Sequence, residues 1–575
     1  MPVDRVPQLT HRERDVLAAL CRPVLSDAVY SEPASTREIA MELFVSEAAV
    51  KQHLLRLYDK FQIHSDEPRR RVRLANEALR VGVGEGGEPQ PVGSVDNSDL
   101  AVHGHEAMSR RLWDEAYEVL AAADTAGSLE PADLEALGEA AVWTDHHDES
   151  IDARQRAHEA YLVAGDLGAA ARMAIALVPN YLARLNMSAA SGWFNKAKRL
   201  LEEEPESATH GELAAMTALI QLATGQIEAG LESAVVAHRL GRKYRDRDLV
   251  ALGLVFQGYA LARVGRLDDS MARLDEAMAS AVAGELGTFA TAIVYCRTIC
   301  TCLDLFDFRR AAEWTDLVQG ITDATGPVGV AGDCRTHQVA VKIFRGEWAE
   351  GEREAELACS ESAAWDLNHT ALAHYELGEI KLRRGNLTAA AEAFHRSHEL
   401  GGLPHPGLAL LHMSEGDLNG AAAAIAGALA GTQDQLTRAK LLPAQAEIAH
   451  ERGDIETARM ATVELDGIAE RYGSQALRAA ADSARGALHL SDGDARTAIR
   501  DLSSGWRLWQ DAGAPYETAR TRLGLARALS EIGDHLSAAM ELETALSTFQ
   551  RLGAAPDAEI AASMLQNLSR EKPLT

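Results

Sequence analysis

LGEIKLRRGNLTAAAEAF (residues 377–394) predicts two helices joined by a tight turn. Gly385 and the polar residue after it mark the turn, because glycine adopts the left-handed conformation that ends one helix and lets the next fold back antiparallel. Gly378 and Ala390 are small residues at points where the two helices must approach closely, and Phe394 fills the gap to the next unit. The segment therefore predicts a helical hairpin.

The same turn recurs along the chain, at a spacing close to about 40 residues in most cases. Each time a helical stretch ends in a glycine followed by a polar residue, and Phe306-Asp307 takes this place between two of the glycines. These glycines are Gly225, Gly265, Gly346, Gly385, Gly416, Gly453, Gly493 and Gly533. A period of this size indicates stacked helix-turn-helix units, each of which buries its apolar face only against its neighbours.

Two further units repeat the spacing of small and large residues. They contain Gly258, Gly265, Leu274 and Ala277, and Ala526, Gly533, Ala538, Leu542 and Ala545. The pattern resembles the tetratricopeptide repeat (TPR), whose members bind peptides, proteins or small molecules. The composition, with 5% aromatic residues and 17 prolines, suits long helices and argues against a β-sandwich. We therefore expect an all-α fold with a TPR-like α-solenoid over residues 100–570.

The first 81 residues predict a separate domain of short helices. Thr10 to Glu13 and Ser35 to Glu38 have the spacing of capping boxes, which start helices near residues 10–21 and 35–44. A third helix over residues 46–61 and a fourth after Pro68 would bury the remaining apolar residues. The apolar face of the third helix is Val50, Leu54, Leu57, Tyr58 and Phe61, and that of the fourth is Leu74, Ala75, Ala78 and Leu79. Residues 82–99, rich in glycine, proline and acids, predict a flexible linker.

A family resemblance covers part of this domain. REIAMELFVSEAAVKQHLLRLYDKF (residues 37–61) resembles the core of LuxR-type helix-turn-helix domains, and LTHRERDVLAAL (residues 9–20) resembles their first helix. The connection over residues 22–34 is longer than the family's usual turn and either forms a small wing or bulges. Stretches within residues 105–555 resemble the TPR half of large actinobacterial LuxR-type regulators. The resemblance implies that residues 46–61 are a recognition helix in the DNA major groove.

Candidate DNA contacts follow from this placement. Gln52 suits an adenine edge, Lys51 suits a guanine edge or a phosphate, and Arg56 with its basic neighbours suits phosphates. The predicted DNA-binding residues are Ser46, Lys51, Gln52, Arg56, Lys60, Arg69, Arg70 and Arg71.

The charge distribution is uneven. The chain has 57 basic and 85 acidic residues, a formal net charge of −28. Residues 1–80 hold 13 basic and 12 acidic side chains, whereas residues 101–575 hold 44 basic and 69 acidic ones. This asymmetry fits a DNA-contacting domain attached to an acidic body, although a net +1 does not establish DNA binding by itself.

Catalytic and cofactor motifs are missing from the sequence, including the G-x-x-x-x-G-K-[ST] loop of NTPases. Cys296, Cys300 and Cys302, with Cys334 and His337, superficially suggest a metal site, but their spacing should spread the thiols around one helix. We therefore expect no enzyme activity, no cofactor and no metal. The absence of a signal peptide or an 18-residue apolar run predicts a cytoplasmic protein with reduced thiols.

These observations predict a transcriptional regulator. Its partners would be double-stranded DNA, an effector on the solenoid (a protein, a peptide or a small molecule) and a second copy of the chain, because one helix-turn-helix contacts few base pairs. The alternative is a non-enzymatic TPR scaffold whose N-terminal helices bind a protein rather than DNA.

Overall fold

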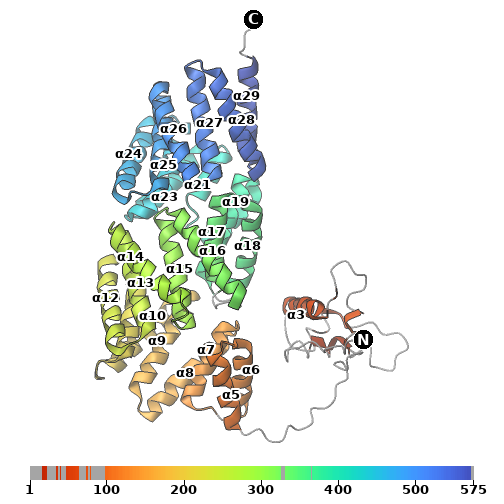
Figure 1. The fold of residues 1–575 in the computed structure, drawn as a ribbon, viewed down its shortest axis with the longest axis vertical. Coiled ribbons are helices and arrows are strands. Elements are labelled where there is room, and N and C mark those ends of the chain that lie inside the picture. The colour runs from red at the N-terminus through yellow and green to blue at the C-terminus, as the bar shows by residue number, and fades with distance from the viewer. Residues whose placement is uncertain are drawn as a thin grey trace. The chain divides into compact units, whose positions relative to one another are not determined.

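The computed structural model describes residues 97–127, 129–325, 331–363 and 366–570, and in the N-terminal part residues 16–17, 19–21, 34–36, 39, 47–61, 63, 73–75 and 78. The chain forms two compact units, Met1–Asp96 and Asn97–Thr575 (Figure 1). Helices are the only regular secondary structure in these ranges, which confirms the predicted all-α class.

The N-terminal unit has a small core centred on α3 (Glu47–Lys60). Val50, Leu54 and Leu57 of α3 are at most 3% exposed. They belong to the same buried cluster as residues from the predicted first, second and fourth helices, namely Val16, Leu17, Leu20, Ile39, Leu74, Ala75 and Ala78. The predicted apolar face of the third helix is therefore buried. The predicted wing lies outside the described residues except for Ala34, and so does the predicted linker up to Asp96.

The second unit is a continuous series of helices stacked as hairpins (Figure 1). Its first helices are α5 (Asn97–Ser109), α6 (Trp113–Thr125), α7 (Pro131–Trp143), α8 (His147–Ala164), α9 (Leu167–Ala183), α10 (Met187–Leu201), α11 (Ala208–Ala223), α12 (Ile227–Tyr244), α13 (Arg247–Arg263) and α14 (Leu267–Val282). The middle helices are α15 (Thr288–Asp304), α16 (Phe308–Thr325), α17 (Ala331–Arg345), α18 (Trp348–Ser362), α19 (Leu367–Arg383), α20 (Leu387–Glu399), α21 (Gly407–Ser414) and α22 (Leu418–Ala430). The last helices are α23 (Gln435–Glu451), α24 (Ile455–Tyr472), α25 (Gln475–Ser491), α26 (Ala495–Asp511), α27 (Pro515–Glu531), α28 (His535–Leu552) and α29 (Ala555–Arg570).

The turns of the hairpins have the predicted backbone conformation. All eight of the predicted turn glycines have positive φ, from 73° at Gly453 to 85° at Gly416, and Phe306 takes the same left-handed conformation with φ 59°. In several hairpins the next residue caps the second helix: the Asp494 carboxylate accepts a hydrogen bond from the Thr497 amide at 3.1 Å. A glycine followed by Asp or Asn therefore ends one helix and starts the next.

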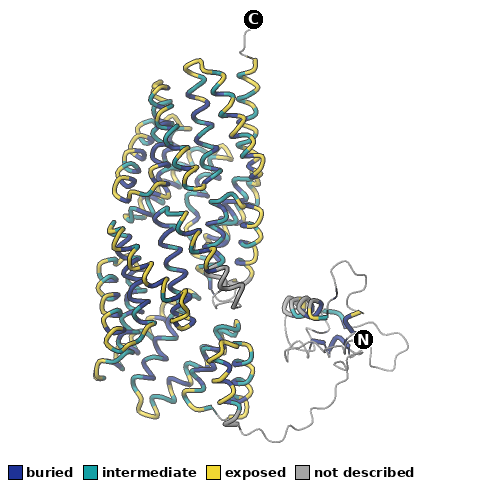
Figure 2. The backbone as a smooth tube through the Cα atoms, viewed as in Figure 1, coloured by how far each residue is buried: buried dark blue, intermediate teal, exposed yellow. Residues whose placement is uncertain are grey.

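Small residues allow the two helices of a hairpin to pack closely, as the sequence indicated. A Cβ atom on Gly378 would lie 2.5 Å from Cε1 of Phe394, and one on Gly258 would lie 2.6 Å from Cδ2 of Leu274. Buried residues fill the interior between the helices, whereas exposed ones follow the outer edges of the unit (Figure 2). The second unit is thus a TPR-like α-solenoid.

The solenoid also coils back on itself. The Tyr472 hydroxyl donates a hydrogen bond to the Arg263 carbonyl at 3.1 Å, across 209 residues of sequence. A Cβ atom on Gly346 would lie 2.6 Å from Leu552, so the α17–α18 turn packs directly against the end of α28. Contacts of this kind join one superhelical turn to the next, and a simple linear array of repeats would have none of them.

Candidate functional site

The predicted recognition helix is α3. Its buried face is held by the core of the N-terminal unit, and Tyr58 is 9% exposed at the edge of that core. Lys51 and Lys60, two of the predicted DNA contacts, are exposed. A helix fixed by one face with lysines on its exposed surface has the geometry that major-groove binding requires.

The structure places the remaining predicted DNA contacts only in part. Gln52 and Arg56 lie on α3 between the two exposed lysines, but their side chains are outside the described part of the structure. Ser46 precedes α3 and, with Arg69, Arg70 and Arg71, lies outside the described residues. The eight predicted contacts therefore remain predictions.

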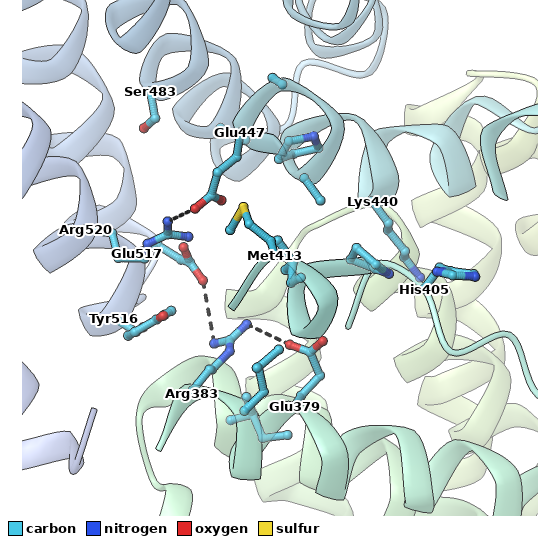
Figure 3. A pocket seen from close by; sticks show the side chains of 18 of the residues that line it. Glu379, Arg383, His405, Met413, Lys440, Glu447, Ser483, Tyr516, Glu517 and Arg520 are labelled. Carbon is cyan, nitrogen blue, oxygen red and sulfur yellow. Dashed lines mark hydrogen bonds and ion pairs between the residues drawn. The ribbon is translucent and has the colours of Figure 1, made fainter. Parts of the chain in front are cut away.

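A second candidate site is a large cavity inside the solenoid, with a volume of about 1430 Å³. Its walls are formed mainly by the first helices of successive hairpins, from α15 to α27, and α29 completes them. Figure 3 shows side chains from α19, α23, α25 and α27 pointing into one space, with Met413 of α21 between them. Helices far apart in sequence thus line one chamber.

Ion pairs link the two sides of this cavity. Arg383 of α19 lies 3.3 Å from a carboxylate oxygen of Glu379 and 3.6 Å from one of Glu517 on α27 (Figure 3). Arg520 of α27 pairs with Glu447 of α23. The two arginines therefore connect α27 to α19 and to α23.

A third ionic group lies at the other end of the cavity. Lys440 of α23 donates a hydrogen bond to the Asp304 carboxylate on α15 at 2.6 Å, and Arg263 of α13 pairs with the same carboxylate. Burial alone would raise the pKa of Asp304, but the charges of Lys440 and Arg263 outweigh it and hold that pKa below its usual value.

Glu376 is an acid of this cavity whose ionisation is disfavoured. It lies one turn before Glu379 on α19, is half-buried, and has no hydrogen-bond or ion-pair partner in the described part of the chain. Burial, with the charge of Glu379, raises its pKa to about 7, although Arg383, Lys440 and His337 act in the opposite direction. An unpaired carboxyl group of this kind at a cavity wall is a typical ligand-binding group.

The three cysteines of α15 lie in different surroundings. Cys302 is fully buried in a separate apolar cluster, as expected, but Cys296 lies 3.7 Å from Nδ1 of His337, and Cys300 lines the cavity beside that histidine. The contact between Cys296 and His337 joins α15 to α17, which no spacing within α15 reveals. Within the described residues no group of three His, Cys, Asp or Glu side chains could hold a metal ion.

Sequence reasoning missed the cavity. One signal was present in the sequence. Glu376, Glu379 and Arg383 have the spacing i, i+3, i+7, which puts three charged residues along one face of a helix. The same helix must also pack against neighbouring helices on two sides. A charged stripe on the first helix of a hairpin would have indicated a polar interior.

Comparison with known proteins supports the assignment of the N-terminal unit. Residues 28–68 match the family of bacterial regulatory proteins described as luxR family. This segment contains all of α3 and five of the eight predicted contacts. Arg69, Arg70 and Arg71 lie just beyond its end.

Searches with the whole chain gave weaker results. No curated protein matched it. Among solved structures, it is similar to the Cut9–Hcn1 hetero-tetramer of the APC/C, with 12% identity over 81% of this chain and 96% of that chain and a TM-score of 0.35. It is also similar to yeast Tom70, with 13% identity over 83% of this chain and 97% of that chain and a TM-score of 0.27. In the described parts of the chain, no helix is long and apolar enough to cross a membrane.

Proposed function

We propose that this protein is a non-enzymatic transcriptional regulator, in which α3 binds double-stranded DNA and the solenoid binds an effector that controls how α3 is presented. The observation that carries the proposal is the luxR-family match over residues 28–68, on a helix whose apolar face is buried and whose lysines are exposed. The cavity of about 1430 Å³ supplies a place for the effector.

The proposed DNA contacts divide into two kinds. Gln52 reads an adenine edge and Lys51 reads a guanine edge or holds a phosphate, whereas Ser46, Arg56, Lys60, Arg69, Arg70 and Arg71 hold phosphates and orient the helix. Because one helix-turn-helix contacts few base pairs, the regulator acts as a homodimer on two half-sites. The proposed sites of action are in the cytoplasm.

The test is selection of bound duplexes from a randomised DNA pool by the full-length protein and by two variants. Lys51→Glu changes an exposed residue of α3, and Lys198→Glu makes the same charge change on an exposed residue of α10. We expect wild type and Lys198→Glu to enrich one motif and Lys51→Glu to lose it while keeping its helical circular dichroism. Binding should weaken steeply with salt, since phosphate contacts release counterions.

The spacing of half-sites in the enriched motif reports whether two copies bind together. Enrichment that survives in Lys51→Glu would refute the assignment of α3 as the reading helix. If no protein enriches any motif, the DNA-binding proposal fails and the N-terminal helices are better explained as a docking module for another protein.

A further inference from the structure

Acidic groups exceed basic ones on the walls of the cavity. Among its lining residues, seven carry carboxylates and four are Lys or Arg, and His337 adds a fifth basic group. Glu451 and Arg527, one acid and one base, are exposed. Leaving out this pair does not change the excess of acidic over basic residues among the remaining lining residues. Because like charges in a partly desolvated space repel one another, the cavity favours a ligand that brings positive charge.

The wall cations are already engaged by other carboxylates. Arg383 pairs with Glu379 and Glu517, Arg520 with Glu447 and with Asp557 at 3.9 Å, and Lys440 with Asp304. Within the residues that the structure describes, Glu376 has no hydrogen-bond or ion-pair partner, although it lies on the same helix as Arg383. The site therefore has one uncompensated carboxyl group that a cation can complete.

Apolar and aromatic side chains also line the cavity. Tyr375, Phe344 and Trp509 are among the lining residues, and so is Leu403, which is 80% exposed. Aromatic faces attract cations, and apolar surface left exposed inside a cavity is stabilised when a ligand covers it. The lining thus suits a molecule that is mostly apolar and carries one positive charge.

We propose that the cavity binds a small organic molecule with one protonated amine on a large apolar body, and that the amine pairs with Glu376. That this molecule is the effector rests on the proposed function. A volume of about 1430 Å³ exceeds the roughly 300–1,000 Å³ of ordinary ligand pockets and leaves space for such a body together with water.

Binding should depend on pH through Glu376. The charged groups that act on it are Glu379 and Arg383 on its own helix, Lys440 of α23 and His337 of α17. With its pKa at about 7 in the empty cavity, Glu376 is largely ionised at pH 8 and largely protonated at pH 6. A cation binds the ionised form, so the affinity should fall as the pH is lowered from 8 to 6, with a proton released on binding near neutral pH.

Three fluorescent probes that share the dansyl group and a five-carbon chain test the proposal on the full-length protein. Dansylcadaverine ends in a protonated amine, N-pentyl dansylamide ends in a methyl group, and N-dansyl-6-aminohexanoate ends in a carboxylate. We expect the amine to bind about tenfold or more tightly than the neutral probe at pH 8, as one charged pair in a partly buried site predicts, and the carboxylate to bind least.

Two variants locate the effect. Glu376→Gln keeps the shape of the side chain and should abolish the preference for the amine, whereas Glu392→Gln, on an exposed position of α20, should leave it intact. Equal binding of the three probes by the wild type, a preference for the carboxylate, or an amine preference that survives in Glu376→Gln would each overturn the proposal. The probe measurement uses no DNA, so its failure would not affect the proposal that α3 binds DNA. A failed DNA selection, in turn, would not affect the proposal that the cavity binds an amine.

Discussion

Gly378 and Gly467 both lie inside helices of the solenoid, yet a methyl group would meet quite different surroundings at the two positions. At Gly378 it would lie 2.5 Å from Cε1 of Phe394, which is fully buried. At Gly467 nothing lies within 4 Å. Gly378 lies where two helices pack closely, whereas Gly467 lies at an open position of its helix. The two glycines should therefore contribute differently to the stability of the protein.

We expect Gly378→Ala to lower the free energy of unfolding by about 1–3 kcal/mol, because the aromatic ring cannot yield without disturbing the buried core. Gly467→Ala should instead raise it by about 0.5–1 kcal/mol, since alanine favours the helical backbone. Urea unfolding of the two variants beside the wild type measures both. Equal effects would contradict the close packing of α19 against α20.

The sequence predicts such pairs of small and large residues, because both members fall within one hairpin at a fixed spacing. It does not single out Glu376. Glu376 and Glu379 are acids three positions apart on one helix, and they differ only in their partners. The arginine that engages Glu379 also engages Glu517, on a helix whose proximity no local pattern reveals.

At the scale of the helix, the chain contains left-handed turn residues that are not glycine. Arg245 ends α12 with φ 57°, and Gly473 ends α24, a helix of the same length, with φ 61°. Leu185 and Arg111 are further cases before the first predicted turn glycine. Such residues explain why the repeat was recognised from Gly225 onward: among the earlier turns only Gly127 and Gly165 are left-handed glycines, and three other turns use Arg111, Asp145 and Leu185.

Exchanging the two end residues should have opposite effects. Arg245→Gly should stabilise the protein by about 1 kcal/mol, because it removes the steric cost of a side chain in the left-handed region, and Arg245 is exposed. Gly473→Arg should destabilise it by about the same amount. Thermal unfolding at matched concentration checks the pair. Two shifts of the same sign would show that side-chain contacts, and not the backbone, determine these helix ends.

For the whole molecule, the contacts between superhelical turns matter most. Arg263 of α13 and Lys440 of α23 both pair with the carboxylate of Asp304 on α15. The side chain of Asp304 is largely buried. The sequence predicted a solenoid but neither its pitch nor its cavity, because these contacts join residues more than 130 positions apart, as between Asp304 and Lys440. No periodic signal encodes such a pairing.

We expect Asp304→Asn to lower the free energy of unfolding by about 3 kcal/mol, since it leaves a lysine and an arginine facing each other without their shared carboxylate. The matched control is Asp275→Asn, which breaks the exposed pair with Arg310 between neighbouring hairpins and should cost less than about 1 kcal/mol. Hydrogen exchange followed by mass spectrometry should show faster exchange in α13 and α23 for Asp304→Asn alone. Unchanged exchange there would contradict a tie between the two turns.

The same long-range contacts determine the order in which the molecule can be assembled. Hairpins close loops of a few residues and form quickly, whereas the bond from Tyr472 to Arg263 closes a loop of 209 residues and must form late. During synthesis from the N-terminus, residues 28–68 leave the ribosome long before α27 and α29 exist to complete the cavity. A nascent chain therefore has its luxR-type segment well before it has a chamber that can hold a ligand.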